Sequence, residues 1–193
     1  EAFYVHIKVL WGLVTKGSIP TPSDEQLQAF YQRFCNSDEI ESAVTRGPSL
    51  ISTDLIQTLK KSRECRTKVG KHILHLSDFH ICYIHSSLSK LGLTTWVPNL
   101  DEQADSLYNV AHQMAAIGTF CECVAGGAYT FMNVNQTYAD NFDLLKTAYK
   151  HYVHFTWLNI CSKEKKESGK HIRDEEQKFL QPACKRVSCS WVF

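Results

Sequence analysis

Apolar side chains recur at helical spacing along most of the chain. The first clear helix start is at Ser23 and Gln26, where each side chain can pair with the other residue's backbone amide as a capping box. Leu27, Phe30 and Phe34 follow at intervals of three to four residues, as expected for one side of an α-helix. The pattern predicts a helix that begins at Ser23 and ends near residue 35.

Further helices are predicted where the same spacing follows a capping residue or precedes a glycine. Ser52 or Thr53 can cap a helix that continues to Gly92, with a break at Gly70 as an alternative. A second capping-box pattern, Asn99 with Glu102, precedes another apolar stripe. The remaining helices are predicted over residues 37–44 and 138–165.

Strand signals are nearly absent from the sequence. Residues 3–14 are apolar and β-branched enough to form either a strand or a short buried helix, and after residue 15 no comparable segment follows. The predicted fold is all-α, an irregular bundle of four to six helices, in which the N-terminal segment is either a short strand or a buried segment. Residues 1–181 are predicted to form a single helical domain, followed by a C-terminal tail over residues 182–193.

Composition changes this picture little. The chain has 193 residues, 44% of them hydrophobic and 21% charged, which is close to globular averages and argues against disorder. The net charge of +1 provides no overall field toward nucleic acid or acidic membrane. Residues 114–134 are apolar, but they include Glu122 and Gly126-Gly127, so we expect a tightly packed core helix and no membrane span.

Eight cysteines leave the redox compartment open between two interpretations. An even number permits four disulfides in a secreted helical protein. Most of the cysteines fall in helix-like stretches, where a free cysteine behaves as a small buried hydrophobe. We therefore expect reduced thiols and an intracellular protein, and a secreted disulfide-bonded protein is the alternative.

Two pairs of histidines could contribute to a metal site. His72 with His75, and His151 with His154, are spaced so that each pair shares one side of a helix. Two such pairs on facing helices would supply four imidazole ligands. The sequence has neither the Glu-x-x-His pattern of di-iron bundles nor His-Glu-x-x-His, so ordinary polar histidines are the favoured interpretation. The cofactor remains unknown at this point.

A basic stretch is the candidate for nucleic-acid contact. It contains a single acidic residue, Glu64, among its basic residues Lys60, Lys61, Arg63, Arg66, Lys68 and Lys71. A second basic area, interleaved with acidic residues, includes Lys170, Arg173, Lys178, Lys185 and Arg186. Such clusters can neutralise phosphates, although they more often form the solvated side of a helix.

The sequence contains no recognisable catalytic motif. It has no phosphate-binding glycine loop and no Gly-x-Ser-x-Gly elbow. The leading prediction is a helical binding module that acts through contacts with a protein or a nucleic acid. The alternative is a helical metalloprotein or enzyme that uses the paired histidines.

Several phrases of the sequence resemble an uncharacterised multicopy protein family of mushroom-forming fungi, associated with mobile elements. The phrases are VHIKVLWGLV at residues 5–14, PNLD at 98–101, DSLYN at 105–109, GGAY at 126–129, HYVH at 151–154, KESGKH at 166–171 and RDEE at 173–176. The family has no assigned activity, so the resemblance implies no catalytic residues. It implies an intracellular fungal protein with a nucleic-acid or protein partner. The tail beyond Pro182 departs from the basic continuation expected for the family.

Overall fold

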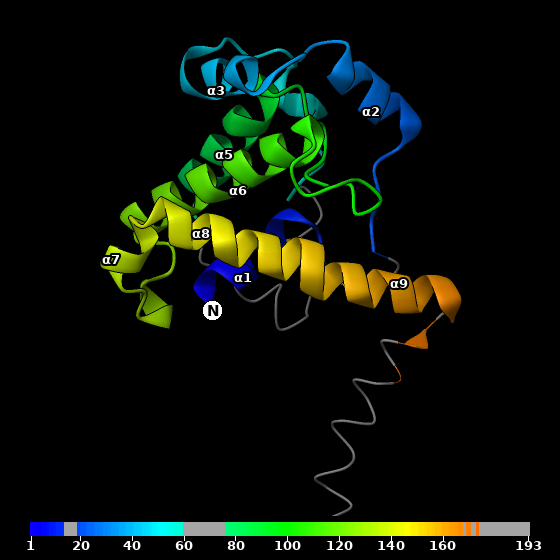
Figure 1. The fold of residues 1–193 in the computed structure, drawn as a ribbon. Coiled ribbons are helices and arrows are strands. Elements are labelled where there is room, and N and C mark those ends of the chain that lie inside the picture. The colour runs from blue at the N-terminus through cyan, green and yellow to red at the C-terminus, as the bar shows by residue number, and fades with distance from the viewer. Residues whose placement is uncertain (14–18, 60–75, 168, 171–172, 174–193) are drawn as a thin grey trace, which may run out of the picture. The chain divides into compact units, whose positions relative to one another are not determined.

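A computed structural model describes residues 1–13, 19–59, 76–167, 169–170 and 173, and its regular elements are all helical (Figure 1). The all-α prediction is confirmed for these residues. The chain divides into two compact units, residues 1–154 and residues 155–193, which are described separately. The predicted tail, residues 182–193, lies outside the described residues.

The N-terminal segment is a buried helix and not a strand. Helix α1 spans Ala2–Leu10, and most of its side chains are buried, including Ile7 and Val9. Gly12 follows with a φ of +70°, a left-handed conformation that glycine adopts without strain and that stops the helix. Periodicity could not decide between strand and helix here, because a segment buried on several sides lacks a polar face.

The first capping box is present as predicted. Ser23 Oγ accepts the amide of Gln26 at 3.3 Å, and Gln26 Oε1 accepts the amide of Ser23 at 3.0 Å. Helix α2 spans Asp24–Tyr31 and therefore ends four residues earlier than expected. Helix α3 spans Ser37–Arg46, where the Asn36 side chain caps it by accepting the amide of Glu39.

The long helix predicted from Ser52 to Leu91 is divided. Ser52 caps only the short 3-10 helix η1, Thr53–Leu55, and residues 60–75 lie outside the described residues. Helix α5 spans Asp78–Lys90 and begins at a capping box of Ser77 with His80, whose imidazole takes the place of the usual Glu or Gln side chain. Gly92 follows α5 with a φ of +66°, as its predicted role as a C-terminal stop requires.

Helix α6, Leu107–Ala125, begins later than the sequence suggested. Its cap is Ser106, whose side chain accepts the amide of Asn109, so the prediction of a capping box at Asn99 is wrong. Asn109 instead ties the preceding loop to the helix: its Oδ1 accepts the Asn99 amide at 2.9 Å, and its Nδ2 donates to the Asn99 carbonyl at 2.8 Å. A buried asparagine with these contacts fixes the loop in the way a backbone turn would.

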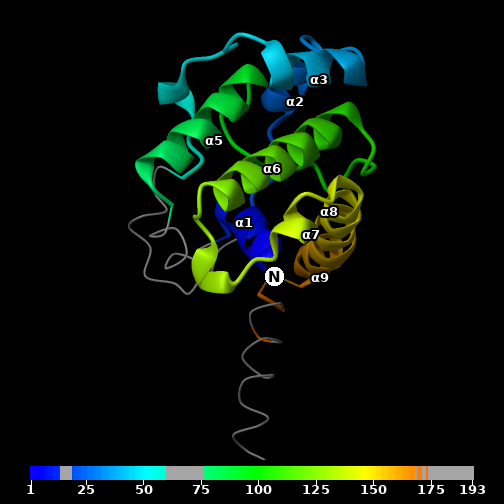
Figure 2. The same cartoon turned by 90° about the vertical axis from the view of Figure 1, so that its left-hand side faces the viewer.

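Helix α6 is the central element of the first unit (Figure 2). It packs against α1, α2, α3 and α5 and against the two helices that follow it. The buried alanines Ala111, Ala115 and Ala116 allow these close approaches, whereas Gly118 and Ala125 lie on the outer side. Among the described residues, no helix is long and apolar enough to cross a membrane.

Most of the range 138–165 is helical, but it differs from the predicted single α-helix in two ways: the long helix starts later, at Phe142, and part of it is π-helical. The short 3-10 helix η3, Thr130–Met132, and helix α7, Gln136–Ala139, come first, and a new cap at Asn141 starts α8, Phe142–Tyr149. Next comes the π-helical segment η4, Lys150–Trp157, which leads into α9, Leu158–Lys166. The boundary between the two units falls within η4.

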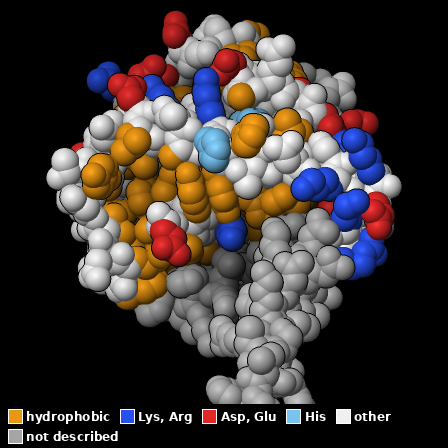
Figure 3. Space-filling model, turned by 60° about the horizontal axis from the view of Figure 1, so that its bottom comes forward, with side chains coloured by type: hydrophobic (Ala, Val, Ile, Leu, Met, Phe, Trp, Pro, Cys, Tyr) orange, Lys and Arg blue, Asp and Glu red, His pale blue; other side chains and the backbone are white. Residues whose placement is uncertain are grey.

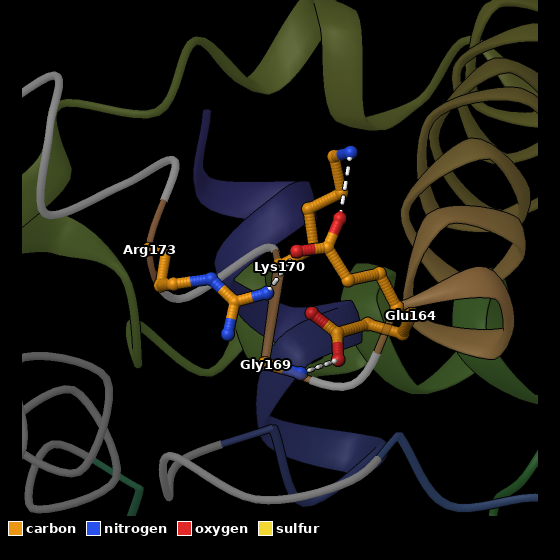
Figure 4. A network of polar contacts seen from close by, with 5 residues as sticks. Glu164, Gly169, Lys170 and Arg173 are labelled. Carbon is orange, nitrogen blue, oxygen red and sulfur yellow. Dashed lines mark hydrogen bonds and ion pairs between the residues drawn. The ribbon is translucent and has the colours of Figure 1, made fainter.

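The second unit has a polar network where α9 ends (Figure 4). Glu164 accepts the amide of Gly169 at 2.8 Å, and Gly169 has a φ of +75°, which turns the backbone. Glu167 forms ion pairs with Lys170 and Arg173. These two cations hold the pKa of the exposed Glu167 carboxyl below its usual value, with the Lys170 contacts the larger cause.

Candidate functional site: the outer face of α5 and α6

Most of the residues predicted to bind nucleic acid lie outside the described residues. This applies to the entire stretch from Lys60 to Lys71, so its role stays a prediction. In the second basic area, Lys170 and Arg173 pair with Glu167. The cationic charge of these two residues is therefore partly neutralised within the chain, while Lys178, Lys185 and Arg186 lie outside the description.

The structure describes half of the predicted histidine metal site. His72 and His75 lie outside the described residues. His151 is exposed and His154 is half-buried, because η4 is π-helical there and the α-helical i,i+3 relation on which the pairing depended does not apply. The described part of the chain contains no group of three or more His, Cys, Asp or Glu side chains placed to hold a metal ion. The four-histidine site stays a prediction.

Four of the cysteines that the structure describes, Cys35, Cys82, Cys121 and Cys123, are free thiols. Cys35 and Cys82 are exposed, Cys121 is half-buried, and Cys123 and Cys161 are buried. Burial raises the pKa of the Cys121 thiol, with a smaller contribution from the Asp140 carboxylate. A raised pKa reduces the thiolate fraction, so Cys121 lacks the activation expected of a nucleophilic cysteine.

The outer side of α5 is apolar and aromatic instead of charged. Phe79, Cys82 and Tyr83 are exposed and share this side at i, i+3 and i+4 spacing, and Phe79 and Tyr83 have exposed fractions of 69% and 38%. Within the helix, charged side chains occur only at its ends, at Asp78 and Lys90. A solvent-facing helix side normally carries charged or polar residues.

The adjoining helix α6 has an outer stripe of similar character. Its incompletely buried positions include Met114, Gly118, Cys121 and Ala125, which recur at intervals of three to four residues. A side chain built at Gly118 would meet nothing within 4 Å, so the surface is open there. Glu122 is the one charged residue in the whole of α6.

The two stripes form one continuous surface. Figure 2 shows α5 and α6 running side by side, and burial together with the Glu122 carboxylate raises the pKa of the Tyr83 hydroxyl. On the other side of the stripe, the Cys121 thiol donates to the Ala139 carbonyl of α7 at 3.3 Å. We call this surface the α5–α6 face; it comprises Phe79, Cys82, Tyr83, Met114, Gly118, Cys121, Glu122 and Ala125.

Apolar side chains reach the surface elsewhere too. Figure 3 shows hydrophobic side chains gathered on the underside of the molecule as Figure 1 draws it. Phe131 and Phe142 have exposed fractions of 42% and 56%, and Tyr138 of α7 has 62%. Exposed aromatic residues therefore occur on more than one side, and those of the α5–α6 face are distinguished by their regular helical register.

Sequence reasoning missed the α5–α6 face, although its signal was present. Counting charges along residues 78–90 and 107–125 would have revealed two helices almost without charge. Such helices are interpreted as fully buried, and only the tertiary structure shows that one side of each is uncovered.

Beneath the surface, a first buried cluster joins α1, α6 and the loop after α6. His6 Nδ1 bonds with the Tyr129 hydroxyl at 2.8 Å, and His6 Nε2 bonds with Thr119 Oγ1 at 2.9 Å. Thr119 donates its own hydrogen to the Ala115 carbonyl at 2.6 Å. Its oxygen therefore accepts from His6 Nε2–H, and His6 Nδ1 accepts from Tyr129. Desolvation lowers the pKa of His6 to about 3, so the ring is neutral and structural.

A second buried cluster surrounds Trp96, in the loop before α6. The Trp96 indole donates to the His112 carbonyl at 3.0 Å, and its ring packs on the rings of His112 and Tyr149 with centroid separations of 5.7 and 6.3 Å. His154 packs on Tyr149 at 5.9 Å. The exposed ion pair of Lys150 with Asp105, 2.6 Å long, lies near enough to His154 to affect its pKa.

Comparison with known proteins adds no assignment. No family model matches the chain, and no curated protein and no solved structure matches it. The fungal family resemblance therefore stays a prediction, and the functional argument depends on the geometry alone.

Proposed function

We propose that this protein is a helical binding module whose partner is another protein, held on the α5–α6 face. The observation that supports the proposal is the combination of exposed aromatic side chains and near absence of charge on two adjoining helices. Water-exposed apolar surface of this kind is unfavourable, and covering it with a partner stabilises the complex.

The composition of the face matches that of protein interfaces. The central parts of such interfaces are depleted in charge and enriched in aromatic residues and methionine, as at Phe79, Tyr83 and Met114. The open surface at Gly118 permits close approach of a partner's backbone. Nucleic-acid binding requires cations instead, and the face itself supplies only the carboxylate of Glu122.

The experiment first captures the partner and then measures affinity in a purified pair. A photo-crosslinking amino acid at position 82 would attach to a protein seated on the face, and the same amino acid at exposed Leu55 serves as the control position. The captured protein is then purified and titrated against the parent chain. We expect the double variant Phe79→Ser, Tyr83→Ser to raise the dissociation constant at least 30-fold, as the loss of interface hot spots does.

Matched controls separate binding from folding. Leu55 has an exposed fraction of 55% and lies in η1, outside the face, so Leu55→Ser should leave the dissociation constant within about twofold of the parent. Both variants should retain the parent's helical circular dichroism. If the double variant binds as tightly as the parent, or if Leu55→Ser weakens binding equally, the proposal is wrong.

Nucleic-acid binding through Lys60, Lys61, Arg63 and Arg66 is tested separately. Replacing these four residues with Ala should weaken binding to duplex DNA and flatten its salt dependence if the stretch contacts phosphates. The double variant of the α5–α6 face should then leave DNA binding unchanged. This pair of variants distinguishes the two classes of partner.

A further inference from the structure

Among the described residues of the first unit, five buried side-chain polar atoms lack a hydrogen-bond partner; two of them, on His80 and Gln113, lie elsewhere, and the other three belong to the cluster around Trp96. The three atoms of this cluster are His112 Nε2, the Tyr149 hydroxyl and His154 Nε2. His112 and Tyr149 are fully buried, and both rings pack on the same indole. His154 is near enough to His112 to lower its pKa and packs directly on Tyr149. Three unpaired buried atoms in one place require a common explanation, because each would be costly alone.

The hydrogen-bonding capacity of the cluster follows from its protonation. His112 Nδ1 lies 2.8 Å from the Tyr108 carbonyl and must donate to it, so Nε2 of the neutral ring is an acceptor. Desolvation lowers the pKa of His112 and of His154 to about 4, and this outweighs the backbone carbonyl and Asp105 contacts that favour protonation. Burial also raises the pKa of Tyr149. At neutral pH the site therefore presents uncharged donors and acceptors.

The backbone provides a second, independent observation. The π-helical segment η4 begins directly after Tyr149 and carries His154. π-helical turns are rare, and they occur frequently at functional sites. Here the departure from α-helical geometry sets the relative placement of Tyr149 and His154.

We propose that His112, Tyr149 and His154 form a binding site for one ordered internal water molecule. The Tyr149 hydroxyl donates to the water, and the water donates to His112 Nε2. His154 Nε2 provides the third contact, as donor or acceptor according to its tautomer. A buried water molecule typically makes about three hydrogen bonds to polar groups that otherwise lack a partner, and this site offers three such groups. The walls, which include the rings of Trp96 and Tyr108, contribute no charge, so the site suits a neutral hydroxylic ligand.

The test combines nuclear magnetic resonance with a hydroxyl deletion. In the parent protein, selective excitation of water should transfer magnetisation to the ring protons of His112 and Trp96 through a long-lived bound water. Tyr149→Phe should abolish this transfer and raise the unfolding equilibrium constant about tenfold, since the hydroxyl's contact with water is lost. The control Tyr129→Phe removes a buried hydroxyl from the other cluster and should leave the transfer at His112 intact.

The presence and the absence of the bound water predict different effects of Tyr149→Phe on stability. Without the water, the Tyr149 hydroxyl is unpaired and unfavourable in the folded state, so its removal would leave the unfolding equilibrium constant unchanged or lower it. Either result for Tyr149→Phe, or the absence of magnetisation transfer in the folded parent, would overturn the proposal. If Tyr149→Phe does not fold, the magnetisation transfer to His112 in the parent and in Tyr129→Phe is sufficient to test the proposal.

Discussion

The first unit contains two buried histidine–tyrosine clusters that differ in how their polar atoms are hydrogen-bonded. Around His6, both ring nitrogens have partners, and the chain of donors ends at the Ala115 carbonyl. Around Trp96, Nδ1 of His112 is paired with the Tyr108 carbonyl, while its Nε2 and the Tyr149 hydroxyl are not. The difference shows that equal burial does not make two polar clusters equivalent: the first is completed by protein atoms and the second needs a further partner.

Lowering the pH should affect both clusters and produces the largest expected effect. The folded-state pKa is about 3 for His6 and about 4 for His112, both below the unfolded value of 6.5. The unfolded chain therefore binds more protons below pH 6.5, and stability present above that pH is lost as the pH falls. Between pH 6.5 and 4 we expect about 3 kcal/mol of lost unfolding free energy from each histidine. Urea unfolding at a series of pH values measures it.

Proton nuclear magnetic resonance assigns the loss to individual rings. The ring signals of His6 and His112 should remain those of the neutral form down to pH 5. A gain of positive charge by either ring above pH 6 would contradict the expected direction.

Replacing His6, both of whose ring nitrogens have hydrogen-bond partners, should destabilise the protein strongly. His6→Ala removes two buried hydrogen bonds, leaves the Tyr129 hydroxyl without its acceptor and Thr119 Oγ1 without its donor, and opens a cavity between α1 and α6. We expect a loss of about 4 kcal/mol of unfolding free energy. Denaturant unfolding at pH 7 checks this, and a loss below about 1 kcal/mol would show that the network is not structural.

Removing single hydroxyls gives the most direct comparison of the clusters. Tyr129→Phe leaves His6 Nδ1 buried and unpaired, so we expect a loss of about 2 kcal/mol. Tyr149→Phe removes no contact with a protein atom, and its effect depends entirely on the proposed water. A Tyr129→Phe variant as stable as the parent would remove the distinction between the two clusters.

The smallest effect is expected at the rim of the second cluster. Asp105→Asn breaks the ion pair with Lys150, but both side chains are largely exposed, and solvent screens such pairs. We expect no measurable change in the urea midpoint. The pKa of His154 should fall slightly, because the Asp105 carboxylate favours its protonated form. A large loss of stability would show that the ion pair closes the cluster.

A local signal in the sequence predicted the start of α2. The pair Ser23 and Gln26 acts as expected because a capping box involves residues only three apart. The same rule predicted a capping box at Asn99, and that prediction was wrong. The Asn99 side chain accepts the amide of Asp101 instead, and Asn109 holds the loop by accepting the Asn99 amide. Distant partners decide between competing local uses of one side chain.

The candidate site was less predictable than the fold. The sequence emphasised cations and paired histidines, because charge and ligand chemistry are visible in residue types. It could not identify the α5–α6 face, whose members are the same apolar residues that fill a core. His6 and His112 were likewise invisible, because nothing in their immediate neighbours indicates a buried partner far along the chain.

The sequence by itself determined the all-α class, the absence of strong charge and the stops at residues such as Gly92, since these follow from periodicity, composition and backbone conformation. Tertiary structure decided which sides of α5 and α6 remain uncovered and which tautomer His6 adopts. It also decided that Tyr149 and His112 meet around Trp96. The physical reason is that burial and hydrogen-bond pairing depend on contacts between residues distant in the chain, which no local pattern encodes.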